Sequence, residues 1–165
     1  MKRALSFFMA VLILLSLASC QRQVNCEEIL TKLLAVSGED TEGSGSIFFK
    51  GAEEGEKGYF SPELMDTMYG ENAGKRYFSK IEDFSVYVSE REPGELAVFR
   101  CYSYSDRDVI AEMCLQRADS IKVTLRDSEY AQKTESIQVI IYRRYVVFSF
   151  TDAPRRVEDK FKALV

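Results

Sequence analysis

The apolar residues change their spacing near Asp83, and this change limits the possible folds more than any other feature of the chain. From there on, apolar and polar residues alternate in single steps, with Phe84, Val86 and Val88 interleaved with Ser85, Tyr87 and Ser89. A period of two is typical of a strand with one buried face. The turn at 91–94 and a second stretch of this kind at 95–102 complete a hairpin, which is antiparallel because its turn is tight.

A helix is expected after this hairpin, and the last third of the chain follows the same plan. The two ββα units are not similar enough in sequence to be a repeat. Earlier segments show helical spacing and helix-start residues such as Asn25 and Ser61-Pro62. The expected order is helix 26–36, short strand 47–50, helix from Ser61, strands 84–89 and 95–102, helix from Ser105, strands 136–142 and 145–151 around Arg143-Arg144, and a final helix that contains Pro154 near its start.

This order of elements predicts an α+β fold. We expect a two-layer sandwich in which an antiparallel sheet of about four to five strands, built from the two ββα units, carries its helices on one face. The other face is predicted to be open, polar and rich in tyrosine. Its expected residues are Ser85, Tyr87, Ser89, Tyr145 and Ser149.

Residues 37–58 are predicted to be mostly flexible loop, because the stretches SGEDTEGSGS and GAEEGEKG within them contain almost no apolar residue. Their acidic residues lack the alternate spacing of a calcium loop. We therefore expect solvated side chains there and predict no metal and no cofactor.

The first twenty residues have the layout of an export signal. Lys2 and Arg3 precede an apolar run, 4–18, that is shorter than the roughly 20 residues of a comfortable membrane span. Leu17-Ala18-Ser19-Cys20 at its end resembles the lipobox of bacterial lipoproteins. That resemblance implies that Cys20 carries diacylglycerol and is the first mature residue, whose two acyl chains hold the protein firmly to a membrane. The alternatives are cleavage after Ala18 with plain secretion, and an uncleaved anchor.

The predicted layout is a lipoprotein signal peptide at 1–19, a tether at 20–25 and a single α+β domain at 26–165. Removing 1–19 takes away Lys2 and Arg3, which leaves 20 basic against 26 acidic residues, a net charge of −6. An acidic domain argues against a nucleic-acid partner. The complete absence of histidine also excludes Ser-His-Asp and Cys-His catalysis. We expect an exported protein anchored to the outer face of the cell membrane.

Several motifs follow one another along the chain: the lipobox, Ser-Pro-Glu-Leu to Met-Tyr-Gly (61–70), Val-Tyr-Val (86–88), Pro-Gly-Glu-Leu-Ala-Val-Phe (93–99), Ser105-Asp106, the helix that carries Arg117, and Arg-Arg-Tyr-Val-Val (143–147). In this order they resemble a family of small, uncharacterised lipoproteins of low-GC Gram-positive bacteria, which is defined only as a domain of unknown function. The resemblance covers about 59–164 and the signal, and it implies an envelope location and an α+β domain without a known activity. The long polar stretch at 37–58 departs from the family pattern.

Two pairs of residues are candidate sites besides Cys20. Cys101 and Cys114 would form a disulfide if the helix folded back over its own strand, but they also suit buried free thiols, and a metal or redox pair is a third interpretation. Cys26 is expected to be an unpaired thiol on the first helix. Arg117 falls on an apolar helix stripe, so Glu95 is the candidate partner for a structural ion pair. The alternatives for Arg117 are a side chain that reaches solvent, and an anion-binding or catalytic role.

These features favour a non-catalytic binding or scaffolding module that has the membrane as a partner through its lipid and a protein or small molecule as its ligand. Nine tyrosines suit either a recognition surface or aromatic packing at the sheet edges. One alternative is a cell-envelope hydrolase that uses carboxylate and tyrosine chemistry. The other is a thiol-redox protein.

Overall fold

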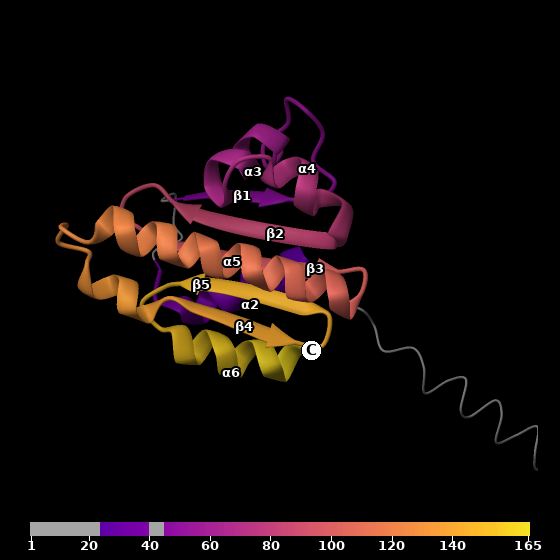
Figure 1. Cartoon of the computed structure of the whole chain (residues 1–165). Coiled ribbons are helices and arrows are strands. Elements are labelled where there is room, and N and C mark those ends of the chain that lie inside the picture. Colours follow the sequence, from indigo (N-terminus) through magenta and orange to yellow (C-terminus); the bar gives the residue numbers. More distant parts are fainter. Residues whose placement is uncertain (1–23, 40–44) are drawn as a thin grey trace, which may run out of the picture.

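The computed structural model describes residues 24–39 and 45–165 (Figure 1). The predicted signal, the lipobox and Cys20 lie outside these described residues. None of the helices in the described part is both long and apolar enough to cross a membrane. The helices are α2 (Cys26–Ser37), α3 (Pro62–Tyr69), α4 (Ala73–Tyr77), α5 (Tyr104–Leu125) and α6 (Pro154–Leu164), with the 3₁₀ turns η1 (Phe78–Lys80) and η2 (Gln132–Ser136); the strands are β1 (Gly45–Phe49), β2 (Ile81–Ser89), β3 (Glu95–Cys101), β4 (Gln138–Tyr142) and β5 (Tyr145–Phe150).

The five strands form one antiparallel sheet in the order β1-β2-β3-β5-β4. The hairpins β2–β3 and β4–β5 are joined through β3 and β5, and β1 adds to the free side of β2. The predicted α+β class, the antiparallel sheet and the two ββα units are therefore confirmed. Arg143 adopts a positive φ of 51° at the β4–β5 turn, which lets two residues reverse the chain.

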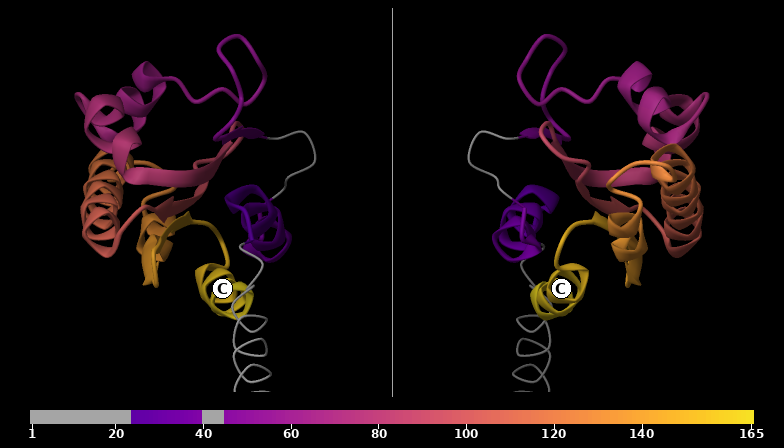
Figure 2. Two further views of the ribbon diagram at one scale, coloured as in Figure 1. Left: turned by 90° about the vertical axis from the view of Figure 1, so that its right-hand side faces the viewer. Right: turned by 90° about the vertical axis from the view of Figure 1, so that its left-hand side faces the viewer.

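Helices cover both faces of the sheet, so the prediction of a two-layer sandwich with helices on one face is wrong (Figure 2). On one side, α3, α4 and α5 pack on a core that includes Phe84, Phe99 and Phe148. On the other side, α2 and α6 pack on a core that includes Leu96 and Val147. The reason is that α2 has an apolar stripe of its own to bury, while α3, α4 and α5 already occupy the first face.

The face predicted to be open and polar is consequently buried. Tyr87 is 2% exposed and Tyr145 is 9% exposed, because both lie under α2 and α6. The small hydroxyls on this face are satisfied inside the protein. Ser85 donates to the carbonyl of Phe48 (3.2 Å), and the hydroxyls of Ser149 and Thr151 lie 3.0 Å apart. The tyrosines on this face are thus packing residues.

Local start signals explain most helix boundaries. The Asn25 side chain accepts the backbone N–H of Glu28, and the hydroxyl of Ser61 accepts that of Leu64, as predicted for these caps. Ser103, not Ser105, is the cap of α5, since its hydroxyl accepts the backbone N–H of Asp106. The segment 37–58, which was expected to be mostly loop, includes the last residue of α2, Ser37, and the strand β1, which pairs with β2.

Candidate functional site

The two residues paired in the sequence analysis lie in contact. Arg117, near the middle of α5, donates from Nε (3.0 Å) and Nη2 (2.9 Å) to Oε2 of Glu95 at the start of β3. The Glu95 side chain is 2% exposed and that of Arg117 is 21% exposed. The pair is brought together because α5 runs back along the hairpin that precedes it. Arg117 is therefore the half of the pair that reaches the surface.

Tyr69 completes this cluster from α3. Its hydroxyl donates to the other carboxylate oxygen of Glu95, Oε1, over 2.8 Å. Burial, followed by the charge of Glu95, raises the pKa of Tyr69 well above its ordinary value, so the phenol stays protonated and remains a donor. Both oxygens of the buried carboxylate thus have a partner, which is what a buried charge requires.

A pocket of about 220 Å³ opens beside Arg117. It lies between the β2–β3 turn, the end of β5 and the C-terminal half of α5. Its wall is mainly apolar, with the Glu95–Arg117 pair as its charged part. The volume is below the roughly 300–1,000 Å³ of pockets for drug-sized ligands, so it suits a small molecule or one end of a larger one. The lining residues are Val88, Ser89, Pro93, Gly94, Glu95, Arg117, Ile121, Thr124, Leu125 and Phe150.

A second charged cluster lies next to this pocket. The Lys133 Nζ contacts Glu39 Oε1 at 3.2 Å and Asp152 Oδ1 at 3.1 Å, and it sits 5.6 Å from the ring centre of Phe150. The Glu39 side chain is only 6% exposed, so the expectation of a solvated side chain is wrong at this position. Burial is the main cause of the raised pKa of Glu39, against the opposing charge of Lys133. Gly94 leaves room for the Glu39 side chain, because a Cβ on residue 94 would lie 2.7 Å from Oε2 of Glu39.

The three described cysteines are separate, buried thiols. Cys101 and Cys114 are each fully buried and are not bonded to one another, which matches the free-thiol interpretation and not the disulfide. A disulfide needs Cα atoms within about 7 Å, and the α5 backbone lies a layer of side chains above β3. Cys26, on α2, is buried on the opposite side of the sheet.

We expect these thiols to resist modification in the folded protein. Burial raises the pKa of Cys101 to about 12 and also raises those of Cys26 and Cys114, so almost no thiolate forms at pH 8. A thiol-specific reagent such as Ellman's reagent should therefore count none of the three in the native protein and all three in denaturing guanidinium. Rapid labelling of any of them in the native state at pH 8 would contradict this.

Tyr69 and Lys133 were not predicted from the sequence as members of the charged clusters. Tyr69 was one of nine tyrosines, and its place on a helix with a buried methionine face was the available signal. No local pattern marks Lys133, whose partner Glu39 is 94 residues away. Among residues 24–39 and 45–165, no group of three or more cysteine or acidic side chains is placed to hold a metal ion.

Comparisons with family models, with curated proteins and with solved structures found no match to this chain. The resemblance to the lipoprotein family therefore stays a prediction. The fold and the pocket define the class as an α+β domain with a helix layer on each face of an antiparallel sheet and a small apolar pocket beside a buried ion pair.

Proposed function

We propose that this chain is an exported, lipid-anchored binding module whose domain holds a small amphipathic ligand in the pocket beside Arg117. The observation that carries the proposal is an apolar wall next to one partly exposed guanidinium, that of Arg117, which is fixed by its hydrogen bonds to the buried Glu95. Such a combination fixes the polar end of a ligand while its apolar part is buried. The lipobox at Leu17 to Cys20 supports attachment to the outer face of the membrane.

The chemistry of the pocket favours binding over turnover. Glu95 is held by Arg117 and Tyr69 on both its oxygens, so it is a positioning group for Arg117. The buried thiols, with their raised pKa values, argue against the thiol-redox alternative. The hydrolase alternative has no specific observation in its favour.

Lipid attachment is tested on the full chain expressed in a Gram-positive bacterium. Mass spectrometry of the membrane fraction should show Cys20 as the first residue with a diacylglycerol mass. Changing Cys20→Ala should remove that mass and stop the processing before residue 20. A mature N-terminus at Ser19, or an unmodified wild-type protein in the medium, would contradict the proposal.

Ligand binding is tested with 4-phenylbutyrate, which joins an apolar ring to an anionic end, and with the neutral 4-phenylbutan-1-ol. All contacts described above lie within residues 24–165, so a chain that begins at Gln21 keeps them and avoids detergent. Saturation-transfer NMR should show a stronger signal for the acid than for the alcohol. The expected preference is about five- to tenfold, because the carboxylate is a better acceptor for the Arg117 guanidinium than the hydroxyl by about 1 kcal/mol.

The control uses two neighbours on α5. Thr124 lines the pocket, and Val123 is 62% exposed outside its lining. Thr124→Trp should fill the pocket and remove the signal, while Val123→Trp should leave it unchanged. Equal effects of the two substitutions, or no signal from either probe with the wild-type chain, would overturn the pocket as the ligand site.

A further inference from the structure

The strand β4 forms one edge of the sheet, with no strand beyond it in the part of the chain that the structure describes. Neighbouring residues of an antiparallel strand point their N–H and C=O groups to opposite sides. The two-residue turn closes on the pair Tyr142–Tyr145, so the backbone groups of Val139 and Ile141 point away from β5. They provide two donors and two acceptors along the edge.

The two edges of the sheet differ in whether other parts of the chain bond to them. At β1, the loop that follows the strand folds back, and the N–H of Phe49 donates to the carbonyl of Gly58 over 3.0 Å. The strand β4, Gln-Val-Ile-Ile-Tyr, has no proline and no charged residue. Proline, charges and bulges are the usual means of preventing an edge from pairing with another chain. Ile141 is in addition 47% exposed.

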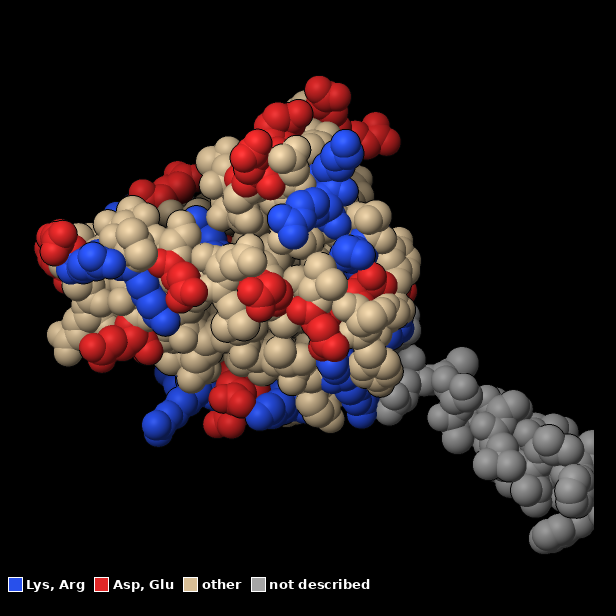
Figure 3. All heavy atoms as spheres, in the orientation of Figure 1, with Lys and Arg blue, Asp and Glu red and all other residues tan. Residues whose placement is uncertain are grey.

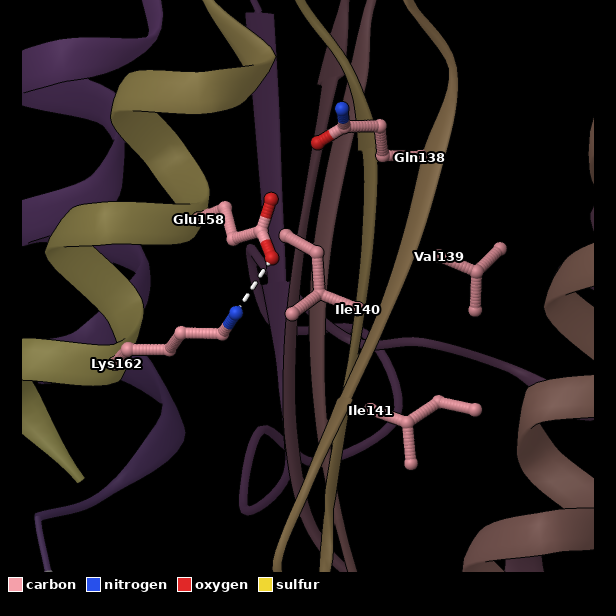
Figure 4. A pocket seen from close by; sticks show the side chains of 6 residues that line it. All are labelled: Gln138, Val139, Ile140, Ile141, Glu158 and Lys162. Atoms are coloured by element: carbon pink, nitrogen blue, oxygen red, sulfur yellow. Dashed lines mark hydrogen bonds and ion pairs between the residues drawn. The ribbon is translucent and has the colours of Figure 1, made fainter.

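A hollow of about 230 Å³ runs along this edge (Figure 4). Four consecutive β4 residues, 138–141, line it together with Glu158 and Lys162 of α6. Consecutive residues point to opposite faces of a sheet, so a hollow lined by all four follows the edge of the strand. Figure 4 shows Gln138 and Ile140 on the α6 side, and Val139 and Ile141 on the side of α5. The Oε1 of Gln138 is buried and has no hydrogen-bond partner.

The wall that α6 gives to this hollow consists of Glu158 and Lys162, whose side chains pair at 2.6 Å. The helix as a whole is basic, although the whole chain is acidic. The helix contains four basic and two acidic residues, and most of their side chains are exposed. Figure 3 shows mainly blue Lys and Arg spheres along the lower rim of the molecule, where Figure 1 places α6. The other wall, formed by Val139 and Ile141, is apolar. The charged residues of α6 are Arg155, Arg156, Glu158, Asp159, Lys160 and Lys162.

We propose that the open edge of β4 binds an extended peptide strand of a partner protein, antiparallel to β4, with acidic side chains toward α6 and β-branched apolar side chains toward α5. Main-chain hydrogen bonds to Val139 and Ile141 give the affinity, and the two walls select alternate side chains, as in other cases of strand addition. This site is separate from the Arg117 pocket and does not depend on the function proposed for it.

A second copy of the chain fits this edge less well. Pairing of β4 with β4 about a two-fold axis brings the two α6 helices together on one face of the joint sheet. Each copy of α6 has an excess of two positive charges, and like charges side by side are destabilising. An acidic strand faces the same helix with opposite charge.

The test uses the full chain in detergent micelles and a fluorescein-labelled peptide, Glu-Val-Glu-Val-Glu-Val-Glu, whose binding is followed by fluorescence anisotropy. In the proposed arrangement, the valine N–H groups point to β4 and the glutamate N–H groups point away from it. N-methylation of the three valines should weaken binding at least roughly tenfold, since each lost hydrogen bond is worth about 1 kcal/mol. N-methylation of three glutamates should change it little. These two peptides leave the protein unaltered.

Two substitutions on α6 form the matched control on the protein. Lys162 lines the hollow and Lys160, two residues away, does not. Lys162→Glu should weaken binding of the acidic peptide by roughly fivefold, and Lys160→Glu should have a clearly smaller effect. Ile141→Pro should also weaken binding, because proline is tolerated where the N–H of an edge strand faces outward but removes that donor.

Three results would overturn the proposal. The first is absence of binding by the wild-type chain at millimolar peptide. The second is equal loss of binding with the two N-methylated peptides, or with the two lysine substitutions. The third is a dimer in sedimentation velocity that Ile141→Pro dissociates, which would make the occupant of the edge a second copy.

Discussion

Replacing Arg117 with methionine is expected to lower the free energy of unfolding by about 3 kcal/mol, the scale found when one half of a buried ion pair is removed. The Glu95 carboxylate is 2% exposed and receives two hydrogen bonds from Arg117. Methionine is apolar and replaces the aliphatic stem of arginine without the guanidinium, so it keeps most of the packing under the pocket but leaves a buried charge without its cation. Urea unfolding followed by circular dichroism measures the loss.

The matched control removes the charge of the partner as well. In the double variant Glu95→Gln with Arg117→Met, the amide oxygen still accepts the hydrogen bond from Tyr69, and no buried charge is left. We expect it to be more stable than Arg117→Met alone by about 1–2 kcal/mol. A loss below about 1 kcal/mol in the single variant, or no recovery in the double one, would show that the pair does not stabilise the fold.

The Glu95–Arg117 pair was within reach of the sequence because both residues belong to one ββα unit. A tight turn fixes the hairpin, and a helix that starts directly after a strand returns over it, so the strand start and the middle of α5 meet. Tyr69 comes from α3, which lies before the hairpin. Its place depends on how α3 docks on the core, and the spacing of nearby residues in the sequence does not predict that docking.

The sequence predicted the hairpins of the sheet but not the number of layers. The alternation near Asp83 predicted the hairpins, but it also suggested that residues such as Tyr87 face solvent. Serine and tyrosine read as polar in a period-two pattern, yet each tolerates burial once its hydroxyl finds a partner. The second helix layer joins α2 and α6, which lie at opposite ends of the described chain. Contacts of such separation leave no local signature.

The pocket and the β4 edge could not be predicted from the sequence either. The pocket is formed where the β2–β3 turn, the end of β5 and α5 meet, and its volume depends on side-chain packing. The β4 edge follows from the strand order, in which β5 and not β4 pairs with β3. The two sites have no lining residue in common. Their tests are therefore independent.

Phe161→Ala is expected to destabilise the protein by about 3–5 kcal/mol, the usual cost of removing a buried phenylalanine ring. Phe161 has no exposed surface, and its ring packs edge-on against Tyr142 (6.4 Å between ring centres) and Tyr145 (6.0 Å). If α6 were not docked on the sheet, Phe161 would be exposed and its loss would cost little. The free energy of unfolding in urea therefore measures whether α6 is packed on the sheet as part of the core.

Val123→Ala is the control for this measurement, because Val123 is 62% exposed on α5 and its truncation should change stability by less than about 0.5 kcal/mol. Combining Phe161→Ala with Arg117→Met tests the layers further. The two residues lie on opposite faces of the sheet, so their effects should add within about 0.5 kcal/mol. A small effect of Phe161→Ala would contradict the packing of α6 on the sheet, and a large deviation from additivity would show that the two faces are coupled through the strands.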